Sequence, residues 1–198
     1  AISRRTGINY APAWAPNQSF LIATLSKDGN PDLYKMDLSG HIQKRLTVNN
    51  GINVSPSFSP DGSQIAFVSD RTGEPQIYLM EVTTGRTQRL TYEGRENTTP
   101  NWSPDGEWIA YTGYGDNGYQ IYKMKARPGG TPIQLTASWG SHESPTWSPD
   151  SRQIAFTRTR NGESKLCTIT SEGQWLQELF TLAGNQSSPQ WSQRLKFY

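Results

Sequence analysis

The residues of this chain that are best suited to chemistry surround one of its two histidines, His142. The run Ser141-His142-Glu143-Ser144 brings hydroxyl, imidazole and carboxylate groups together in sequence. A hydrolytic triad needs such groups in contact, usually beside an oxyanion hole. The chain has no Gly-x-Ser-x-Gly nucleophile elbow, and the second histidine, His41, lies in a separate turn. We therefore predict no catalytic residue and no enzyme activity. His142 is interpreted as a partner-binding or pH-sensitive residue, or as an ordinary loop residue.

Three aspartates, Asp61, Asp105 and Asp150, invite a metal-binding or acid–base interpretation. Each follows Ser-Pro in a copy of the same turn motif, so the three carboxylates are expected to lie apart. Aspartate in a Pro-Asp-Gly turn bonds back to its own backbone, and we expect that role here. Binding of a cation in the channel by backbone carbonyls and loop acids remains an alternative, but the sequence has no dedicated ligand cluster. We predict no metal site and no cofactor.

The remaining reactive and charged residues point to ordinary packing and solvation. The lone cysteine, Cys167, has no disulfide partner and no metal-site spacing, so we expect a buried packing thiol. The net charge is +2, from 19 basic and 17 acidic residues, which implies no nucleic-acid or anionic-membrane partner. Arg158 and Arg160 could form ion pairs or bind an acidic peptide, with solvated loops as the default. No apolar run approaches the roughly 20 residues that cross a bilayer.

These residues are positioned by a repeat with an almost constant period. The motif Ser-Pro-x-[Phe/Trp]-Ser-Pro-Asp-Gly recurs with its central aromatic residue at steps of 44, 44, 45 and 44 residues. A period in the forties, built from short apolar runs and Gly/Pro/Asp turns, is typical of propeller blades. The shared phase of these aromatic residues predicts that they pack between blades. They are Trp14, Phe58, Trp102, Trp147 and Trp191.

The chain is therefore predicted to be all-β, a β-propeller built of four-stranded blades. About four complete blades are expected, at residues 10–47, 54–91, 98–136 and 143–180, with residues 187–192 as an extra first strand. Four blades with stray terminal strands would leave sheet edges and apolar faces open. We therefore expect possible self-association through the open ends.

Longer stretches of the repeat resemble one known family. These are 53–62, 65–71, 75–80 and 89–94, together with Ser188-Pro189-Gln190-Trp191-Ser192 near the end of the sequence. They are similar to the propeller of the TolB family, periplasmic proteins of the Tol-Pal system of Gram-negative bacteria. The resemblance covers essentially the whole chain. It implies the later part of a six-bladed ring, without that family's small N-terminal α/β domain.

The resemblance also implies a function. In that family the propeller docks the lipoprotein Pal, and the import segments of certain colicins, at the mouth of its channel. It implies a periplasmic protein that is peripheral to the outer membrane through its partner and supports outer-membrane integrity and cell division. The Ser-Pro-Asp-Gly core also occurs in propellers of tricorn-like and prolyl-oligopeptidase-like peptidases. A non-catalytic gating propeller of such a peptidase is thus the alternative, and a self-assembling fragment is a third hypothesis.

Loops that lead into the first strand of each blade share one face of a propeller with the loops between second and third strands. On this face the chain is rich in amides and weakly charged, which suits hydrogen bonding to an inserted peptide. The alternative is that these are solvated turns. The predicted partner-binding residues are Asn9, Tyr10, Asn53, Val54, Asn97, Thr98, His142, Glu143 and Gln186.

Overall fold

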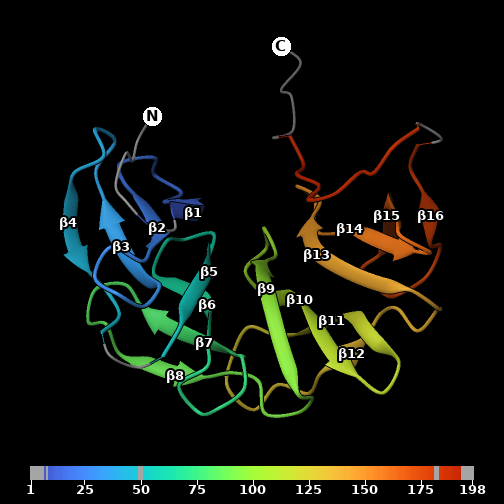
Figure 1. Ribbon diagram of the computed structural model, residues 1–198, viewed down its shortest axis with the longest axis horizontal. Coiled ribbons are helices and arrows are strands. Elements are labelled where there is room, and N and C mark those ends of the chain that lie inside the picture. The colour runs from blue at the N-terminus through green and yellow to red at the C-terminus, as the bar shows by residue number, and fades with distance from the viewer. Residues whose placement is uncertain (1–6, 8, 49–50, 181–182, 193–198) are drawn as a thin grey trace. The chain divides into compact units, whose positions relative to one another are not determined.

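The computed structural model describes residues 7, 9–48, 51–180 and 183–192 (Figure 1). In these residues the regular structure is entirely β, with sixteen strands in four four-stranded sheets. Each sheet uses four strands that follow one another in the chain, and neighbouring strands run antiparallel. This arrangement confirms the prediction of an all-β chain built of propeller blades. Within the described part, no helix has the length and apolar character to cross a membrane.

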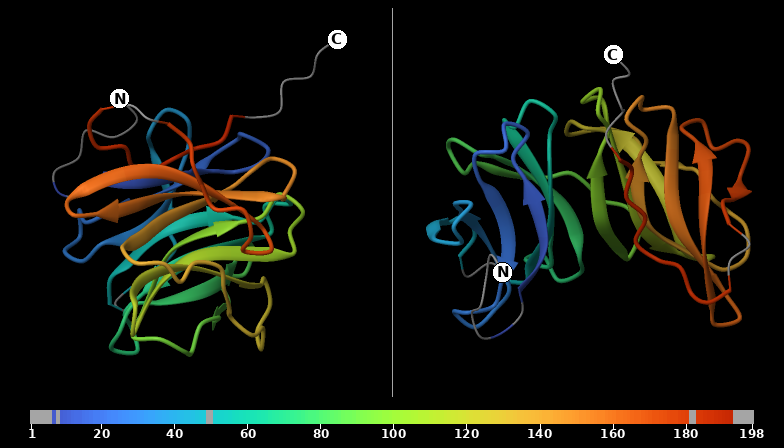
Figure 2. Two further views of the ribbon diagram at one scale, coloured as in Figure 1. Left: turned by 90° about the vertical axis from the view of Figure 1, so that its right-hand side faces the viewer. Right: turned by 90° about the horizontal axis from the view of Figure 1, so that it is seen from above.

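The strands recur in the same order in each sheet, and Figure 2 shows the twist of the individual sheets. The first sheet contains β1 (Asn9–Trp14), β2 (Leu21–Leu25), β3 (Asp32–Met36) and β4 (Ile42–Arg45). The second contains β5 (Asn53–Phe58), β6 (Gln64–Ser69), β7 (Gln76–Glu81) and β8 (Thr87–Arg89). The third contains β9 (Glu96–Trp102), β10 (Trp108–Gly115), β11 (Gly118–Lys125) and β12 (Ile133–Gln134). The fourth contains β13 (Ser141–Trp147), β14 (Gln153–Arg160), β15 (Glu163–Thr170) and β16 (Gln177–Glu178).

The chain divides into two compact units, Ala1–Pro100 and Asn101–Tyr198, and β9 spans the boundary. In the first unit the core includes residues of the first two sheets: Ile22, Leu33, Ile65, Phe67, Tyr78 and Met80. In the second unit a cluster joins residues of β10, β11 and the position after β12 to residues of β13, β14 and β15: Ala110, Ile121, Leu135, Trp147, Ile154, Phe156, Cys167 and Ile169. Cys167 is fully buried in this cluster, as the sequence predicts.

The turns after the first strands form as their sequence predicts. Ser59 Oγ donates a 2.6 Å hydrogen bond to Asp61 Oδ1, which also accepts the Ser63 backbone N–H at 3.0 Å. These bonds, led by the one from Ser59, hold the pKa of Asp61 below its usual value. Gly62 completes the turn at a φ of +72°, and Gln18 adopts +56° at the same repeat position. The left-handed conformation favours glycine, so the turn at Gln18 is strained.

The repeated aromatic residues are not all core residues. Trp102 and Trp147 are 8% and 4% exposed, as predicted, but Trp14 is 51% exposed and Trp191 is 36% exposed. The apolar cluster on the Trp14 side of the first sheet, around Leu21 and Met36, is formed by residues of that sheet alone. The prediction that Trp14 packs between blades is therefore wrong, because burial there needs a second sheet on this face.

The segment predicted as an extra first strand, residues 187–192, is not a regular strand. It nevertheless docks on the fourth sheet: Ser188 N–H donates to Thr157 Oγ1 and Trp191 Nε1–H donates to the carbonyl of Thr146, both at 3.1 Å. Ser188 has a φ of +52°, which is typical of the bulge residue in the first strands of this chain. The segment thus follows the course of a first strand without a second strand to pair with in the described residues.

β13 makes the same two hydrogen bonds to the third sheet that Ser188 and Trp191 make to the fourth. Ser144 N–H donates to Thr112 Oγ1, and Trp147 Nε1–H donates to the carbonyl of Asn101, again at 3.1 Å each. These bonds to the preceding sheet form both in β13, which pairs with a second strand, and in the segment 187–192, which does not pair with one in the described residues. Docking on the preceding sheet therefore does not depend on pairing within a sheet.

Candidate partner-binding surface

The predicted partner-binding residues lie where the first strand of each sheet begins. Most of them fall in the opening residues of β1, β5, β9 and β13, whereas Gln186 begins the docked segment that ends near Trp191. Their side chains differ sharply in accessibility. Asn53, Asn97 and His142 are buried, Val54, Thr98, Glu143 and Gln186 are half-buried, and Asn9 and Tyr10 are exposed.

The amide of Asn53 is fully engaged inside the first unit. Its Nδ2 donates 2.9 Å hydrogen bonds to Asp32 Oδ1 and to the carbonyl of Gly51. Its Oδ1 accepts a 2.9 Å bond from Arg71 Nη2. Asn53 is 0% exposed, so its amide joins neighbouring sheets and is not presented to solvent.

Asn97 repeats this arrangement one blade later. Its Nδ2 donates to Gln76 Oε1 at 2.9 Å and to the carbonyl of Glu93 at 2.7 Å. Gln76 Oε1 also accepts a 2.8 Å bond from Thr91 Oγ1, which itself accepts the backbone N–H of Ile77 at 2.9 Å. This set of bonds is here called the junction network.

The junction network recurs in three sheets with the same geometry. A third-strand acid or amide accepts from the threonine two residues after the fourth strand at 2.6 to 2.8 Å, and that threonine accepts a backbone N–H at 2.9 to 3.0 Å. The pairs are Asp32 with Thr47, Gln76 with Thr91, and Gln120 with Thr136. All six side chains are buried, so the network satisfies polar groups that the sheets enclose.

His142 occupies the position that asparagine holds in the earlier sheets. It is 0% exposed, its Nε2 lies 3.2 Å from Ser138 Oγ, and its ring centroid lies 5.5 Å from that of Phe156. Burial, which is the largest cause, and the positive charges of Arg160 and Arg158 together lower its pKa to about 4. His142 is therefore a neutral, buried strand residue and not an exposed loop residue.

The exposed residues Asn9 and Tyr10 border an apolar pocket of about 190 Å³ in the first unit. Tyr10 is 42% exposed, and burial of the rest of its ring raises the pKa of the phenol. The other lining residues are Pro12, Leu21, Ala23, Leu25 and Met36. Of the nine predicted residues, these two have exposed side chains beside a pocket.

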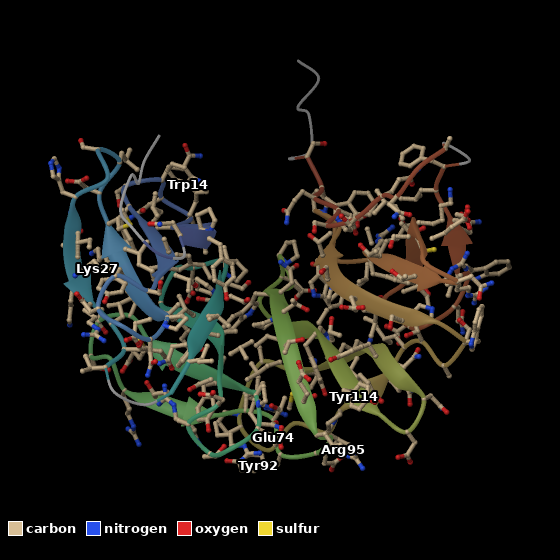
Figure 3. All side chains as sticks on the ribbon, viewed as in Figure 1. Trp14, Lys27, Glu74, Tyr92, Arg95 and Tyr114 are labelled. Carbon is tan, nitrogen blue, oxygen red and sulfur yellow. The ribbon has the colours of Figure 1, made fainter. Side chains whose placement is uncertain are left out.

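Sequence reasoning missed two exposed aromatic residues in the connections between fourth and first strands. Tyr92 is 67% exposed in the first unit, where Figure 3 places it at the same edge as Glu74 and Arg95. Trp139 is 65% exposed in the second unit. A guanidinium lies over each ring: that of Arg89 is 4.8 Å from the centroid of Tyr92, and that of Arg160 is 5.7 Å from the centroid of Trp139. Their position a few residues after the repeated threonine was the available signal.

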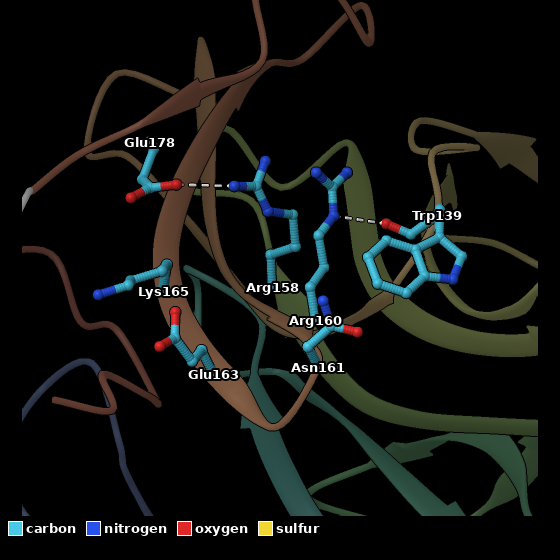
Figure 4. A pocket seen from close by; sticks show the side chains of 7 residues that line it. All are labelled: Trp139, Arg158, Arg160, Asn161, Glu163, Lys165 and Glu178. Carbon is cyan, nitrogen blue, oxygen red and sulfur yellow. Dashed lines mark hydrogen bonds and ion pairs between the residues drawn. The ribbon is translucent and has the colours of Figure 1, made fainter.

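The second unit also contains a polar pocket of about 470 Å³ (Figure 4). Arg158 Nη2 forms a 2.7 Å ion pair with Glu178 Oε2, and Arg160 Nε donates a 2.7 Å bond to the carbonyl of Trp139. The remaining lining residues are Asn161, Glu163 and Lys165. Among the described residues, no group of three or more His, Cys, Asp or Glu side chains could hold a metal ion.

Comparisons with known proteins place these features in a family. The family described as the TolB beta propeller domain matches residues 1–195. The Tol-Pal system protein TolB of Desulfosudis oleivorans is 46% identical over 43 residues, which are 22% of this chain and 10% of that protein. A crystal structure of TolB from Acinetobacter baumannii matches with a TM-score of 0.82 and 26% identity, over 94% of this chain and 47% of that chain.

The same fold occurs in an enzyme. An oligogalacturonate lyase from Vibrio parahaemolyticus matches with a TM-score of 0.71 and 14% identity, over 92% of this chain and 56% of that chain, which shows likeness of fold alone. The chain spans about half the length of the TolB structure that it matches. Because the TolB match extends over nearly the whole chain and agrees with the observed blades, the chain belongs to the TolB beta propeller domain family.

Proposed function

We propose that this chain docks protein partners as part of a periplasmic TolB-type propeller. The observation that carries the proposal is the family match over residues 1–195, together with the TolB structural match. The ligands proposed are a Pal-like lipoprotein and colicin-type import segments. Through such a partner the protein would be peripheral to the outer membrane and support outer-membrane integrity and cell division.

The contact surface proposed in the first unit is the rim of the apolar pocket beside Asn9 and Tyr10. An exposed tyrosine offers a large apolar ring with a hydroxyl at its edge, a combination that is enriched where proteins bind one another. Asn9 lies next to it and donates from Nδ2 to the carbonyl of Gly7 at 2.9 Å, which orients its side chain. In the first unit, Val54 and Thr98 are proposed as further contacts, and Asn53 and Asn97 as buried residues that hold their strands in place. In the second unit, Glu143 and Gln186 are proposed as contacts, and His142 as a buried residue of the same kind.

The proposed role is binding and not catalysis. His142 is 0% exposed, so it cannot reach a substrate in solution, and its neighbour in space is Phe156. The alternative, a gating propeller of a peptidase, would also be non-catalytic. The two differ in partner: the TolB-type role requires affinity for a lipoprotein, whereas the gating role requires a hydrolase domain.

Binding of the soluble domain of a Pal-like lipoprotein, measured by surface plasmon resonance, tests the proposal. Tyr10→Ala should weaken binding about tenfold or more, as truncation of an interface aromatic typically does. Leu38→Ala is the matched control, because Leu38 is 52% exposed just beyond the end of β3, whereas Tyr10 lies near the start of β1, opposite the end of β2. Absence of binding by the unmodified chain, or equal losses in both variants, would refute the proposal.

A further inference from the structure

The fourth sheet departs from the repeat at the positions that form the junction network elsewhere. In the first three sheets the third-strand residue is Asp32, Gln76 or Gln120, and strand register pairs it with Leu25, Ser69 or Gly113. In the fourth sheet the equivalent residue is Lys165, and register pairs it with Arg158. Two cations thus stand opposite each other where the other blades pair an acid or amide with a neutral residue.

This pairing is not one that the sheet itself favours. Like charges directly opposite each other on neighbouring strands are destabilising. Arg160 adds a third cation, because residues i and i+2 of a strand project from the same face. Figure 4 shows Arg158 and Arg160 extending side by side from β14. The pocket therefore concentrates positive charge where that charge does not stabilise the fold.

The described residues use only some of the guanidinium donors of Arg158 and Arg160. Arg158 donates from Nη2 to Glu178, whose side chain is 37% exposed, and its Nε and Nη1 make no hydrogen bond to a described residue. Arg160 donates from Nε to Trp139 O and from Nη2 to Ser138 Oγ, which leaves Nη1 without a described acceptor. Unused guanidinium donors in a pocket suit a ligand with carboxylate oxygens.

One wall of the pocket is preformed. A Cβ at Gly140 would lie 2.7 Å from Arg160 Cγ and from the carbonyl of Thr159, so glycine allows the connection to approach β14 closely. This approach holds the Trp139 carbonyl on Arg160 and leaves the indole 65% exposed beside the guanidinium. The wall therefore presents a flat apolar surface next to the cations.

The balance of charge selects the class of ligand. Three cations and two carboxylates, Glu163 and Glu178, leave a formal charge of +1 among the lining residues. That charge suits a single carboxylate better than a phosphate or a polyanion. A volume of about 470 Å³ accommodates one or two side chains and not a folded domain.

We propose that this pocket binds an acidic peptide segment of a partner protein, with one carboxylate on the unused donors of Arg158 and Arg160 and the adjacent side chain on Trp139. The inference rests on the proposed docking function and names the chemistry of one ligand. The lining residues lie on β14, β15 and β16 and in the 138–140 connection, and none of them is a partner-binding residue predicted from the sequence, although strand register pairs Arg158 with the buried His142.

The test uses a probe peptide that carries fluorescein on its N-terminal amine, Gly-Ser-Glu-Phe-Gly-Ser-amide, and the same labelled peptide with glutamine for glutamate. Fluorescence anisotropy should show that the acidic probe binds at least about tenfold more tightly than the glutamine probe, which is the difference expected for charge-assisted hydrogen bonds. Arg158→Gln and Arg160→Gln should each abolish most of this preference. Arg152→Gln is the matched control, because Arg152 is an exposed arginine at the opposite end of the same hairpin.

A gain-of-affinity variant guards against misfolding as the cause of any loss. Glu178→Gln removes the carboxylate that competes for Arg158, so it should tighten binding of the acidic probe and leave the glutamine probe unchanged. Equal binding of the two probes, or an effect of Arg152→Gln equal to that of Arg158→Gln, would overturn the inference. Tighter binding of inorganic phosphate than of the acidic probe would overturn it as well.

The outcomes separate this inference from the proposed function. If a Pal-like domain binds and its affinity is insensitive to Tyr10→Ala, the proposed first-unit surface fails while the pocket is judged by the probes alone. If the acidic probe binds through Arg158 and Arg160 but no Pal-like domain binds, the pocket stands and the proposed function fails.

Discussion

Replacing His142 with asparagine should remove a step from the pH dependence of folding stability. The position accepts asparagine elsewhere in the repeat, at Asn53 and Asn97, where the side chain is buried and hydrogen bonded. The substitution therefore removes a titrating group and leaves a residue type that the blade already uses. His142 is 0% exposed and close to two arginines, so its charged form is disfavoured in the folded state.

The magnitude follows from the pKa of the folded and unfolded states. Folding lowers the pKa of His142 from 6.5 to about 4, so the folded protein holds the neutral form and the unfolded chain takes up the proton first. The stabilisation is present above pH 6.5 and is lost as the pH falls toward 4. Between pH 7 and pH 5 this single group should lower the free energy of unfolding by about 2 kcal/mol.

Urea unfolding of the wild-type chain and of His142→Asn near pH 7 and near pH 5 measures this difference. Other titrating groups contribute equally to both proteins, so the difference between their pH dependences isolates His142. His41→Asn controls for the loss of a histidine, because His41 is 79% exposed at its side chain and lies in the turn before β4.

Two results would refute the reasoning. One is a pH dependence that is the same in wild type and His142→Asn, which would mean that the imidazole has equal access to protons in the folded and unfolded states. The other is an equal change in His142→Asn and His41→Asn, which would remove burial as the cause.

Three further predictions concern packing, turns and association. Trp147→Ala should cost about 3–5 kcal/mol in urea unfolding because the ring is 4% exposed, and Trp191→Ala, 36% exposed, should cost less; a Trp147 loss under about 1 kcal/mol would contradict this. Gln18→Gly should raise stability by about 1 kcal/mol in thermal unfolding, because its φ is +56°; a decrease would show that the turn is unstrained. The exposed face around Trp14 should cause self-association in sedimentation up to about 100 μM, weakened by Trp14→Ser; a monomer throughout would refute it.

Local features of the chain could be predicted because their causes are local. The Ser-Pro-Asp-Gly turn forms from a serine, an aspartate and a glycine within four residues, and the structure shows the bonds of Ser59, Asp61 and Ser63 that such a turn requires. The period of the motif then predicts four-stranded blades, since each turn ends a strand of limited length. The family resemblance rested on the same repeated runs.

Accessibility could not be predicted from the repeat. Asn9, Asn53 and Asn97 are equivalent in sequence phase, yet Asn9 is exposed and the other two are buried. An asparagine at this position is buried when the third strand of a preceding sheet supplies an acceptor, such as Asp32 Oδ1 for Asn53. The amide-rich loops that suggested binding are therefore largely part of the junction network.

The charged pocket of the fourth sheet was decided by tertiary structure in a different way. Arg158, Arg160 and Lys165 are visible in the sequence, but their meaning depends on strand register, which sets Lys165 opposite Arg158 and brings Trp139 against Arg160. The sequence by itself determined the blades, their turns and the family. Which polar groups face solvent was decided by packing between sheets, because burial depends on neighbours that are distant in the chain.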